Sequence, residues 1–208
     1  MGYQTVFKRN EAEYVEKRSR FIATLCHCET EDEANAFVKE MKSKYWDARH
    51  NVYAYSVDGG RMCRFSDDGE PHGTAGKPML DCIQGSGITN IAVVVTRYFG
   101  GILLGTGGLV RAYSKATQDV LSSAEVYIML QGIRGEIICE YSDLTLLQNL
   151  IAESEGEIED TRYTDKITIT FVLKEEFYVS FKEKLRESFC ARLEMEEKDK
   201  ILLPFLKK

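Results

Sequence analysis

The chain has 208 residues, of which 44% are hydrophobic and 29% charged, and its formal net charge is −6 at pH 7. These values are typical of a soluble globular protein with one large or two small domains, and they exclude a disordered or fibrous chain. The longest uncharged segments, residues 82–96 and 98–110, are each shorter than the ~20 residues that cross a bilayer, so we expect no membrane association.

The cysteines and the first residues of the chain indicate a cytoplasmic location. Six cysteines are too few for a disulfide scaffold, and most lie in apolar segments where a thiol behaves as a small hydrophobic group. The first twenty residues carry eight charged side chains and no apolar run, so no secretory signal is expected. The segment Cys26-His27-Cys28 has no second Cys or His pair at metal-ligand spacing, which favours alternation along a strand over a metal site.

The first part of the chain predicts an alternation of strands and helices. Thr30 and Glu33 have the spacing of a capping box, and Pro78 suits the first turn of a short helix. The run Val93-Val94-Val95 indicates a strand buried on both faces. In chain order we expect a strand at 20–28, a helix at 30–45, a strand at 51–57, a helix at 78–84, a strand at 91–96 and a helix at 108–123.

The composition changes after the last of these helices. Twelve of the sixteen glycines fall between Gly59 and Gly108, whereas the chain beyond residues 132–135 is acidic and almost free of glycine. We therefore predict two domains, residues 1–131 and residues 132–208. The first carries 15 basic and 16 acidic side chains, a net charge of −1, and the second carries 12 and 17, a net charge of −5.

The second domain has a simple predicted order of elements. Residues 166–173 alternate apolar side chains with threonine, as expected of a half-buried strand. Ser142 or Asp143 is placed to cap the N-terminus of the predicted helix that follows and runs to about residue 154. We expect a strand at 136–141, a helix to about 154, strands at 157–163 and 166–173, a helix at 177–190 and a strand at 193–203, which is the βαββαβ order of a ferredoxin-like domain.

A glycine-rich segment between a buried strand and a helix is the strongest candidate site. Its glycines let another molecule approach the main chain, and the unpaired N–H groups of a helix start attract anions. Arg111 is expected in the first turn of that helix. The alternative is that the glycines serve only tight helix–sheet packing. The predicted anion- or nucleic-acid-binding residues are Gly100, Gly101, Gly105, Gly107, Gly108, Arg111, Arg97, Lys77, Arg20, Arg49 and His50.

Other side chains suggest weaker alternatives. Asp67, Asp68 and Glu70 place three carboxylates in one turn, which could hold Mg²⁺ or simply stabilise the loop. Lys77 lies beside the N-terminus of the following short helix, where the same attraction for anions applies. Aromatic residues such as Phe99 could stack on nucleobases if they are exposed, although strand aromatics usually lie in the core.

Several long motifs resemble the YigZ/IMPACT family. The resemblance covers essentially the whole chain and is carried by residues 19–22, 48–55, 65–78, 95–101 and 104–113. It implies an α+β fold in two domains. The first would be similar to the second domain of ribosomal protein S-five, and the second would be ferredoxin-like. Eukaryotic members inhibit a translational-control kinase through an additional N-terminal domain that this sequence does not contain, so that role is not expected here.

The resemblance and the candidate anion site together favour one function over two others. We expect a non-enzymatic, cytoplasmic protein that binds RNA or the ribosome, acts as a translation regulator and needs no cofactor. The first alternative is a Mg²⁺-dependent enzyme that acts on a phosphorylated small molecule, because kinases share the first fold. The second is that the C-terminal domain recruits a protein partner.

Overall fold

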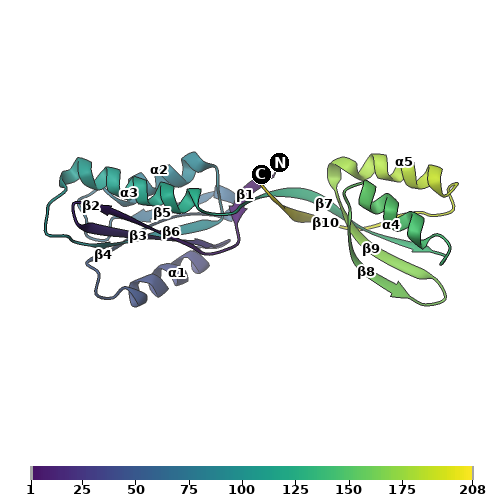
Figure 1. The fold of residues 1–208 in the computed structure, drawn as a ribbon, viewed down its shortest axis with the longest axis horizontal. Coiled ribbons are helices and arrows are strands. Elements are labelled where there is room, and N and C mark those ends of the chain that lie inside the picture. The colour runs from purple at the N-terminus through teal and green to yellow at the C-terminus, as the bar shows by residue number, and fades with distance from the viewer. Residues whose placement is uncertain (1, 208) are drawn as a thin grey trace. The chain divides into compact units, whose positions relative to one another are not determined.

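The computed structural model describes residues 2–207, in which five α-helices, two 3₁₀ turns and ten strands form two compact units (Figure 1). The N-terminal unit spans Tyr3–Ile128 and the C-terminal unit spans Met129–Phe205. Strand β7 (Val126–Cys139) passes from one unit into the other, and the predicted boundary at residues 132–135 lies within it. The fold is mixed α/β with two antiparallel sheets. No helix within residues 2–207 is both long enough and apolar enough to cross a membrane.

The N-terminal unit is built on a five-stranded antiparallel sheet. Its central strand pairs residue by residue with both neighbours, so that Arg97 lies between Phe21 on one side and His50 on the other. This register brings side chains from three strands to one end of the sheet. The strand order is β2 (Asn10–Glu16), β3 (Ser19–His27), β6 (Ile91–Tyr98), β4 (His50–Val57) and β5 (Met62–Ser66).

Helices cover both faces of this sheet. Helices α2 (Gly76–Ser86) and α3 (Gly105–Ser122) lie on one face, and α1 (Glu31–Lys44) lies on the other (Figure 1). Strand β6 therefore has two buried faces: Val93 and Val95 pack in the core under α2 and α3, and Val94 packs in the core under α1. This arrangement confirms the strand predicted from the run of valines.

The prediction lacks three strands of this unit and starts one of its helices too late. Strands β1 (Tyr3–Val6), β2 and β5 were not predicted, because β2 and β5 are edge strands whose polar residues hide the alternation. Helix α3 begins at Gly105 rather than Gly108, so Arg111 lies in its second turn and not in its first. Glycine weakens a helix, but burial of Gly108 and Leu109 in the core offsets that cost.

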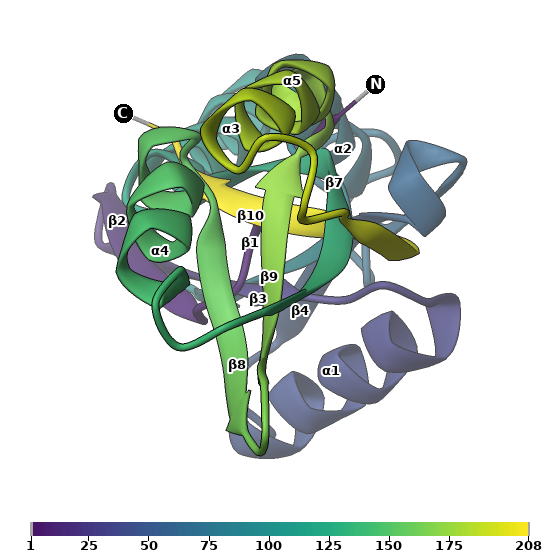
Figure 2. The ribbon, with the colours of Figure 1, turned by 90° about the vertical axis from the view of Figure 1, so that its right-hand side faces the viewer.

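The C-terminal unit has the element order predicted for it. In its five-stranded sheet β7 is followed by β9 (Ile167–Lys174) and β8 (Glu157–Tyr163), and both β10 (Glu196–Leu206) and β1 also pair with β7. Helices α4 (Leu144–Glu153) and α5 (Tyr178–Ser188) pack on one face (Figure 2). Val172 of β9 is also buried, but the predicted alternation is confirmed, because the four apolar side chains of the alternating set lie in the core. These are Ile167, Ile169, Phe171 and Leu173.

Candidate functional site

A cleft of about 400 Å³ opens in the N-terminal unit, at the end of the sheet where β6 stops and α3 begins. This volume is in the range of small-molecule pockets. Three segments that are far apart in the sequence meet there, residues 49–50, 69–71 and 97–109. The first and the last are joined because His50 of β4 and Arg97 of β6 are register partners, and the second because Glu70 pairs with Arg97. The lining residues are Arg49 and His50, Gly69, Glu70 and Pro71, and Arg97, Phe99, Leu103, Leu104, Gly105, Thr106 and Leu109.

The start of α3 forms one wall of the cleft. Leu104 occupies the N-cap position, where its side chain offers no hydrogen bond to the first turn. Residues 105–107 are exposed, and Gly105 has a φ of 71°, a conformation that favours glycine. The first amides of a helix have no intrahelical acceptor and carry the positive end of the helix dipole. The start of α3 therefore presents uncapped N–H donors beside the cleft.

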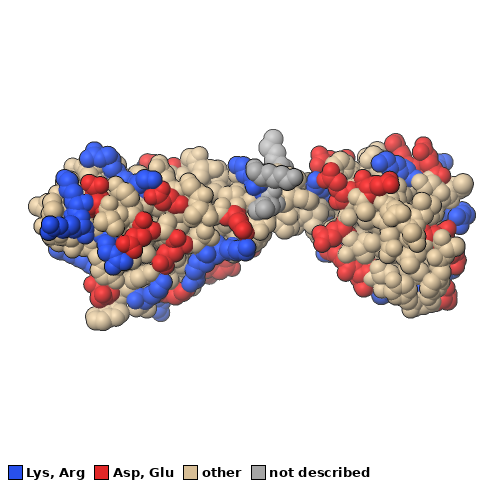
Figure 3. All heavy atoms as spheres, viewed as in Figure 1, with Lys and Arg blue, Asp and Glu red and all other residues tan. Residues whose placement is uncertain are grey.

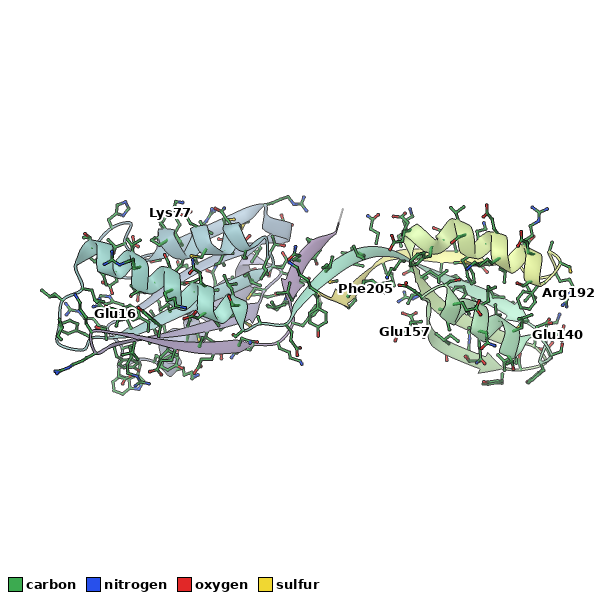
Figure 4. All side chains as sticks on the ribbon, turned by 45° about the horizontal axis from the view of Figure 1, so that its top comes forward. Glu16, Lys77, Glu140, Glu157, Arg192 and Phe205 are labelled. Atoms are coloured by element: carbon green, nitrogen blue, oxygen red, sulfur yellow. The ribbon has the colours of Figure 1, made fainter. Side chains whose placement is uncertain are left out.

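At the start of α2, the corresponding N–H groups are bound by a side chain of the protein itself. The carboxylate of Asp67 accepts N–H bonds from Gly73 at 2.9 Å, from Ala75 at 3.2 Å and from Gly76 at 2.8 Å. An acidic side chain of the protein thus occupies the second predicted anion site. Lys77 is exposed on α2, pairs with Asp81 and lies outside the cleft (Figure 4).

A buried ion pair supports the floor of the cleft. The Nη1 group of Arg97 donates to Oε1 of Glu70 at 2.6 Å, and the hydroxyl of Tyr113 donates to the same oxygen at 2.9 Å. The Arg97 side chain is only 8% exposed, and its guanidinium lies 5.5 Å from the ring centroid of Phe21 and 5.7 Å from that of Phe99. Burial and the neighbouring carboxylate raise the pKa of Tyr113. The Nε group of Arg97 is buried and has no hydrogen-bond partner among residues 2–207.

The turn after β5 holds His50 in place. Its Nδ1 lies 2.8 Å from the carbonyl oxygen of Asp68, and the Asp68 carboxylate accepts the Asn51 N–H at 2.7 Å and the Lys42 ammonium at 2.6 Å. Since the carbonyl can only accept, Nδ1 carries the proton and Nε2 remains available to a ligand.

The three carboxylates suggested for Mg²⁺ do not converge. Asp67 binds the loop that enters α2, Asp68 binds Asn51 and Lys42, and Glu70 binds Arg97. Within residues 2–207 there is no group of three or more His, Cys, Asp or Glu side chains placed to hold a metal ion.

Several cations at this end of the unit make no ion pair with any residue between 2 and 207. Arg49 lines the cleft beside the start of α3, and Lys17 and Arg111 line a neighbouring hollow with Leu104 and Gly108. Figure 3 shows Lys and Arg side chains over the end where β2 stops. Arg111 is exposed, and its Nη1 reaches back along the helix to within 3.8 Å of the position that a Cβ on Gly107 would take. Arg20, in contrast, is bound by both oxygens of Glu13 and lies outside the cleft. The cations without such a pair are Lys17, Arg18, Arg49 and Arg111.

The five glycines of the predicted site serve different purposes. A Cβ on Gly100 would lie 2.0 Å from the carbonyl carbon of Arg18, so this glycine is required for packing, whereas a Cβ on Gly108 would lie 3.0 Å from the Cβ of Leu104 and would need only a small shift of that side chain. Gly101 and Gly105 have positive φ, which the turn requires. Gly107 faces open space apart from the Arg111 guanidinium. Packing therefore accounts for Gly100 and backbone conformation for Gly101 and Gly105, while anion binding by this segment stays a prediction.

Sequence reasoning did not identify every residue that lines the cleft. Leu103 and Pro71 form its apolar rim, and Leu103 is 82% exposed. Phe99, considered only as an aromatic that could stack if exposed, is 50% exposed and lines the cleft. The partnership of Glu70 with Arg97 could not be read from a spacing of 27 residues.

Comparison with known families gives two matches along the chain. A model described as the Impact N-terminal domain matches residues 17–121, which include every residue that lines the cleft. A model described as a domain of unknown function (DUF1949) matches residues 137–192 of the C-terminal unit.

Curated proteins and a solved structure extend these matches to most of the chain. An "IMPACT family member" of Haemophilus influenzae is 41% identical over 181 residues, which are 85% of this chain and 87% of that protein. The "IMPACT family member YigZ" of Escherichia coli is 38% identical over 82% of this chain and 85% of its own length. A structure described as that of a hypothetical protein has a TM-score of 0.61 and 33% identity, and the match covers 95% of this chain and 98% of the other. The "Protein IMPACT homolog" of Dictyostelium discoideum matches only 51% of this chain, at 36% identity.

Proposed function

The chain belongs to the IMPACT family, and on that basis we propose that it is a non-enzymatic regulatory protein that binds RNA, free or in the ribosome. In this proposal a phosphate of the RNA backbone binds the uncapped amides at the start of α3. Arg49 and Arg111 add their charges from either side. Family membership confirms the predicted resemblance and is consistent with a regulatory role.

The single observation that carries this proposal is the contrast between two helix starts in the same unit. Asp67 accepts the N–H groups of Ala75 and Gly76 where α2 begins, whereas within residues 2–207 the start of α3 has no capping side chain and lies among cations that make no ion pair. A protein of net charge −6 does not attract RNA by its overall field, so a local site of this kind is needed.

The C-terminal unit offers less to a phosphate. On the sheet face opposite its core, Arg134 pairs with Glu159 at 2.6 Å and with Asp199 at 2.9 Å, and Arg162 pairs with Glu136 at 2.8 Å. Arg134 and Arg162 are thus compensated by neighbouring acids, whereas Lys182, Lys184 and Arg186 of α5 make no ion pair with residues 2–207. Recruitment of a protein partner through residues 132–208 stays a prediction.

The domain folds and the location are part of the same proposal. We assign residues 1–131 to the fold of the second domain of ribosomal protein S-five, supported by two helices that pack on one face of a five-stranded sheet. We assign residues 132–208 to the ferredoxin-like fold, supported by the order β10-β7-β9-β8 and the βαββαβ succession. Six cysteines without disulfides favour the cytoplasm.

Filter binding of transfer RNA and ribosomal RNA across a salt series tests the proposal. We expect retention at low salt, and a slope of log K against log salt that falls by about one for each phosphate contact removed. Arg49→Ala and Arg111→Ala should each weaken binding. Lys39→Ala removes an exposed cation of α1 that also makes no ion pair with residues 2–207, and it should leave binding unchanged. Absence of retention at low salt would overturn the proposal.

A further inference from the structure

The rim of the cleft is apolar and exposed, which a site for phosphate alone does not require. Phe99 is 50% exposed and Leu103 is 82% exposed, and both stand beside the start of α3. Large apolar side chains that gather at a charged cleft usually mark a surface that contacts another molecule. A ligand for this cleft should therefore carry an anionic group next to a flat or apolar group.

The ring of Phe99 is held in place from below. The guanidinium of Arg97 lies 5.7 Å from its centroid, and Arg97 is in turn fixed by Glu70 at 2.6 Å and by the ring of Phe21 at 5.5 Å. A cation against one face of an aromatic ring attracts the electrons of that ring and limits its motion. Phe99 therefore forms a platform whose support is already assembled before any ligand binds.

Arg97 also keeps unused capacity for hydrogen bonding. Its side chain is only 8% exposed and lines the cleft, and its Nε group has no partner in the described part of the chain. A buried donor without an acceptor costs free energy. The residue that bears this cost lines the cleft, so a charged guanidinium with an unsatisfied nitrogen lies at its floor, independently of the helix start.

We propose that the cleft takes a single unpaired nucleotide of RNA, with its phosphate at the start of α3 and its base stacked on Phe99. This inference rests on the proposed function and specifies its substrate: single strands, loops or bulges rather than continuous duplex. In a duplex the bases are stacked inside and cannot reach an aromatic ring, whereas unpaired bases can. Stacking on one ring is tolerant of sequence, because every base has a flat face.

Fluorescence anisotropy with labelled RNA tests this inference on the full chain. The probes are a single-stranded oligouridine of about eight nucleotides and a duplex RNA of equal phosphate number. Uridine monophosphate serves as competitor and distinguishes a free nucleotide from one within a strand. Phe99→Leu removes the aromatic face but keeps an apolar side chain, and Phe99→Trp restores an aromatic face. Phe65→Leu is the matched control, since Phe65 is 40% exposed and does not line the cleft.

We expect the single strand to bind more tightly than the duplex, and Phe99→Leu to weaken single-strand binding about tenfold. Phe99→Trp should bind as the original chain does, and Phe65→Leu should have no effect. If duplex and single strand bind equally well and Phe99→Leu changes neither, the inference is overturned while the proposed function stands. If no RNA binds, both fail. If uridine monophosphate alone saturates the cleft at concentrations that leave the oligonucleotide unbound, the ligand is a free nucleotide and the inference is wrong.

Discussion

Arg97 and Glu70 form an ion pair of 2.6 Å whose side chains are 8% and 3% exposed, and they do so across 27 residues of sequence. The pair joins the central strand of the sheet to the turn that follows β5. It thereby fixes two walls of the cleft with respect to each other and supports the ring of Phe99.

Replacement of one partner of this pair should lower the free energy of unfolding. Glu70→Gln leaves the Arg97 charge buried without a counterion, so we expect a loss of about 3 kcal/mol in the free energy of unfolding, measured by urea denaturation. Glu13→Gln removes the partner of Arg20 at the surface and should cost about 0.5 kcal/mol. Equal effects of the two substitutions would show that the buried pair does not stabilise the fold.

The Asp67 carboxylate should stabilise the start of α2. Asp67→Ala removes the acceptor of three backbone N–H groups, and we expect a loss of about 2 kcal/mol in urea denaturation. Asp81→Ala in the same helix removes only an exposed i,i+4 pair with Lys77 and should cost less than about 0.5 kcal/mol. A change at Asp67 no larger than the change at Asp81 would contradict this role.

Two glycines of the same segment should respond in opposite ways to alanine. In Gly100→Ala the new Cβ meets the carbonyl of Arg18 at about 2 Å, so we expect strong destabilisation. In Gly107→Ala the methyl group enters open space in a helix, which should stabilise the protein by about 0.5 kcal/mol. Thermal unfolding of both variants measures the difference, and a similar shift in the same direction would be inconsistent with the packing described here.

Cys26 should be a reactive thiol at neutral pH. A hydrogen bond from Cys28 and the guanidinium of Arg9, 3.8 Å from the sulfur, lower the pKa of Cys26 below that of an ordinary thiol. Because the thiolate is the nucleophile, alkylation by iodoacetamide should rise with pH to a midpoint below that of an ordinary thiol and then level off.

Mass spectrometry of the alkylated peptides measures this midpoint. Arg9→Met removes a charge that favours the thiolate, and it should move the midpoint to higher pH. Labelling of the exposed Cys190 in the same sample should not respond to that substitution. An identical Cys26 profile with and without Arg9 would rule out the assigned cause.

Local features of the sequence were sufficient to predict many of the elements. Thr30 does cap α1 by accepting the Glu33 N–H at 3.3 Å, and the valines of β6 are buried on both faces. The edge strands β2 and β5 are not predicted, because charged and polar side chains interrupt the alternation of apolar and polar residues. Propensity and periodicity act over a few residues, so they predict well only where burial follows a regular period.

For the candidate site, too, the sequence predicts some features and not others. That an anion site could lie between β6 and α3 follows from glycine content alone, and the cleft is found there. The sequence does not show that Lys77 lies outside the cleft, nor that the nearby N–H groups bind Asp67 at the start of the same loop. Arg20 is likewise outside, bound by Glu13 across a strand pair.

The amino-acid sequence by itself determined the family, the alternation of elements and the glycine-rich turn, since these depend on residue types and short spacings. Only the tertiary structure decided which charges are compensated and which amides stay uncapped. An ion pair such as Arg97 with Glu70 forms between residues that are distant in the chain, so its existence depends on strand register and packing. Whether a cation remains available to a ligand is therefore a property of the folded surface.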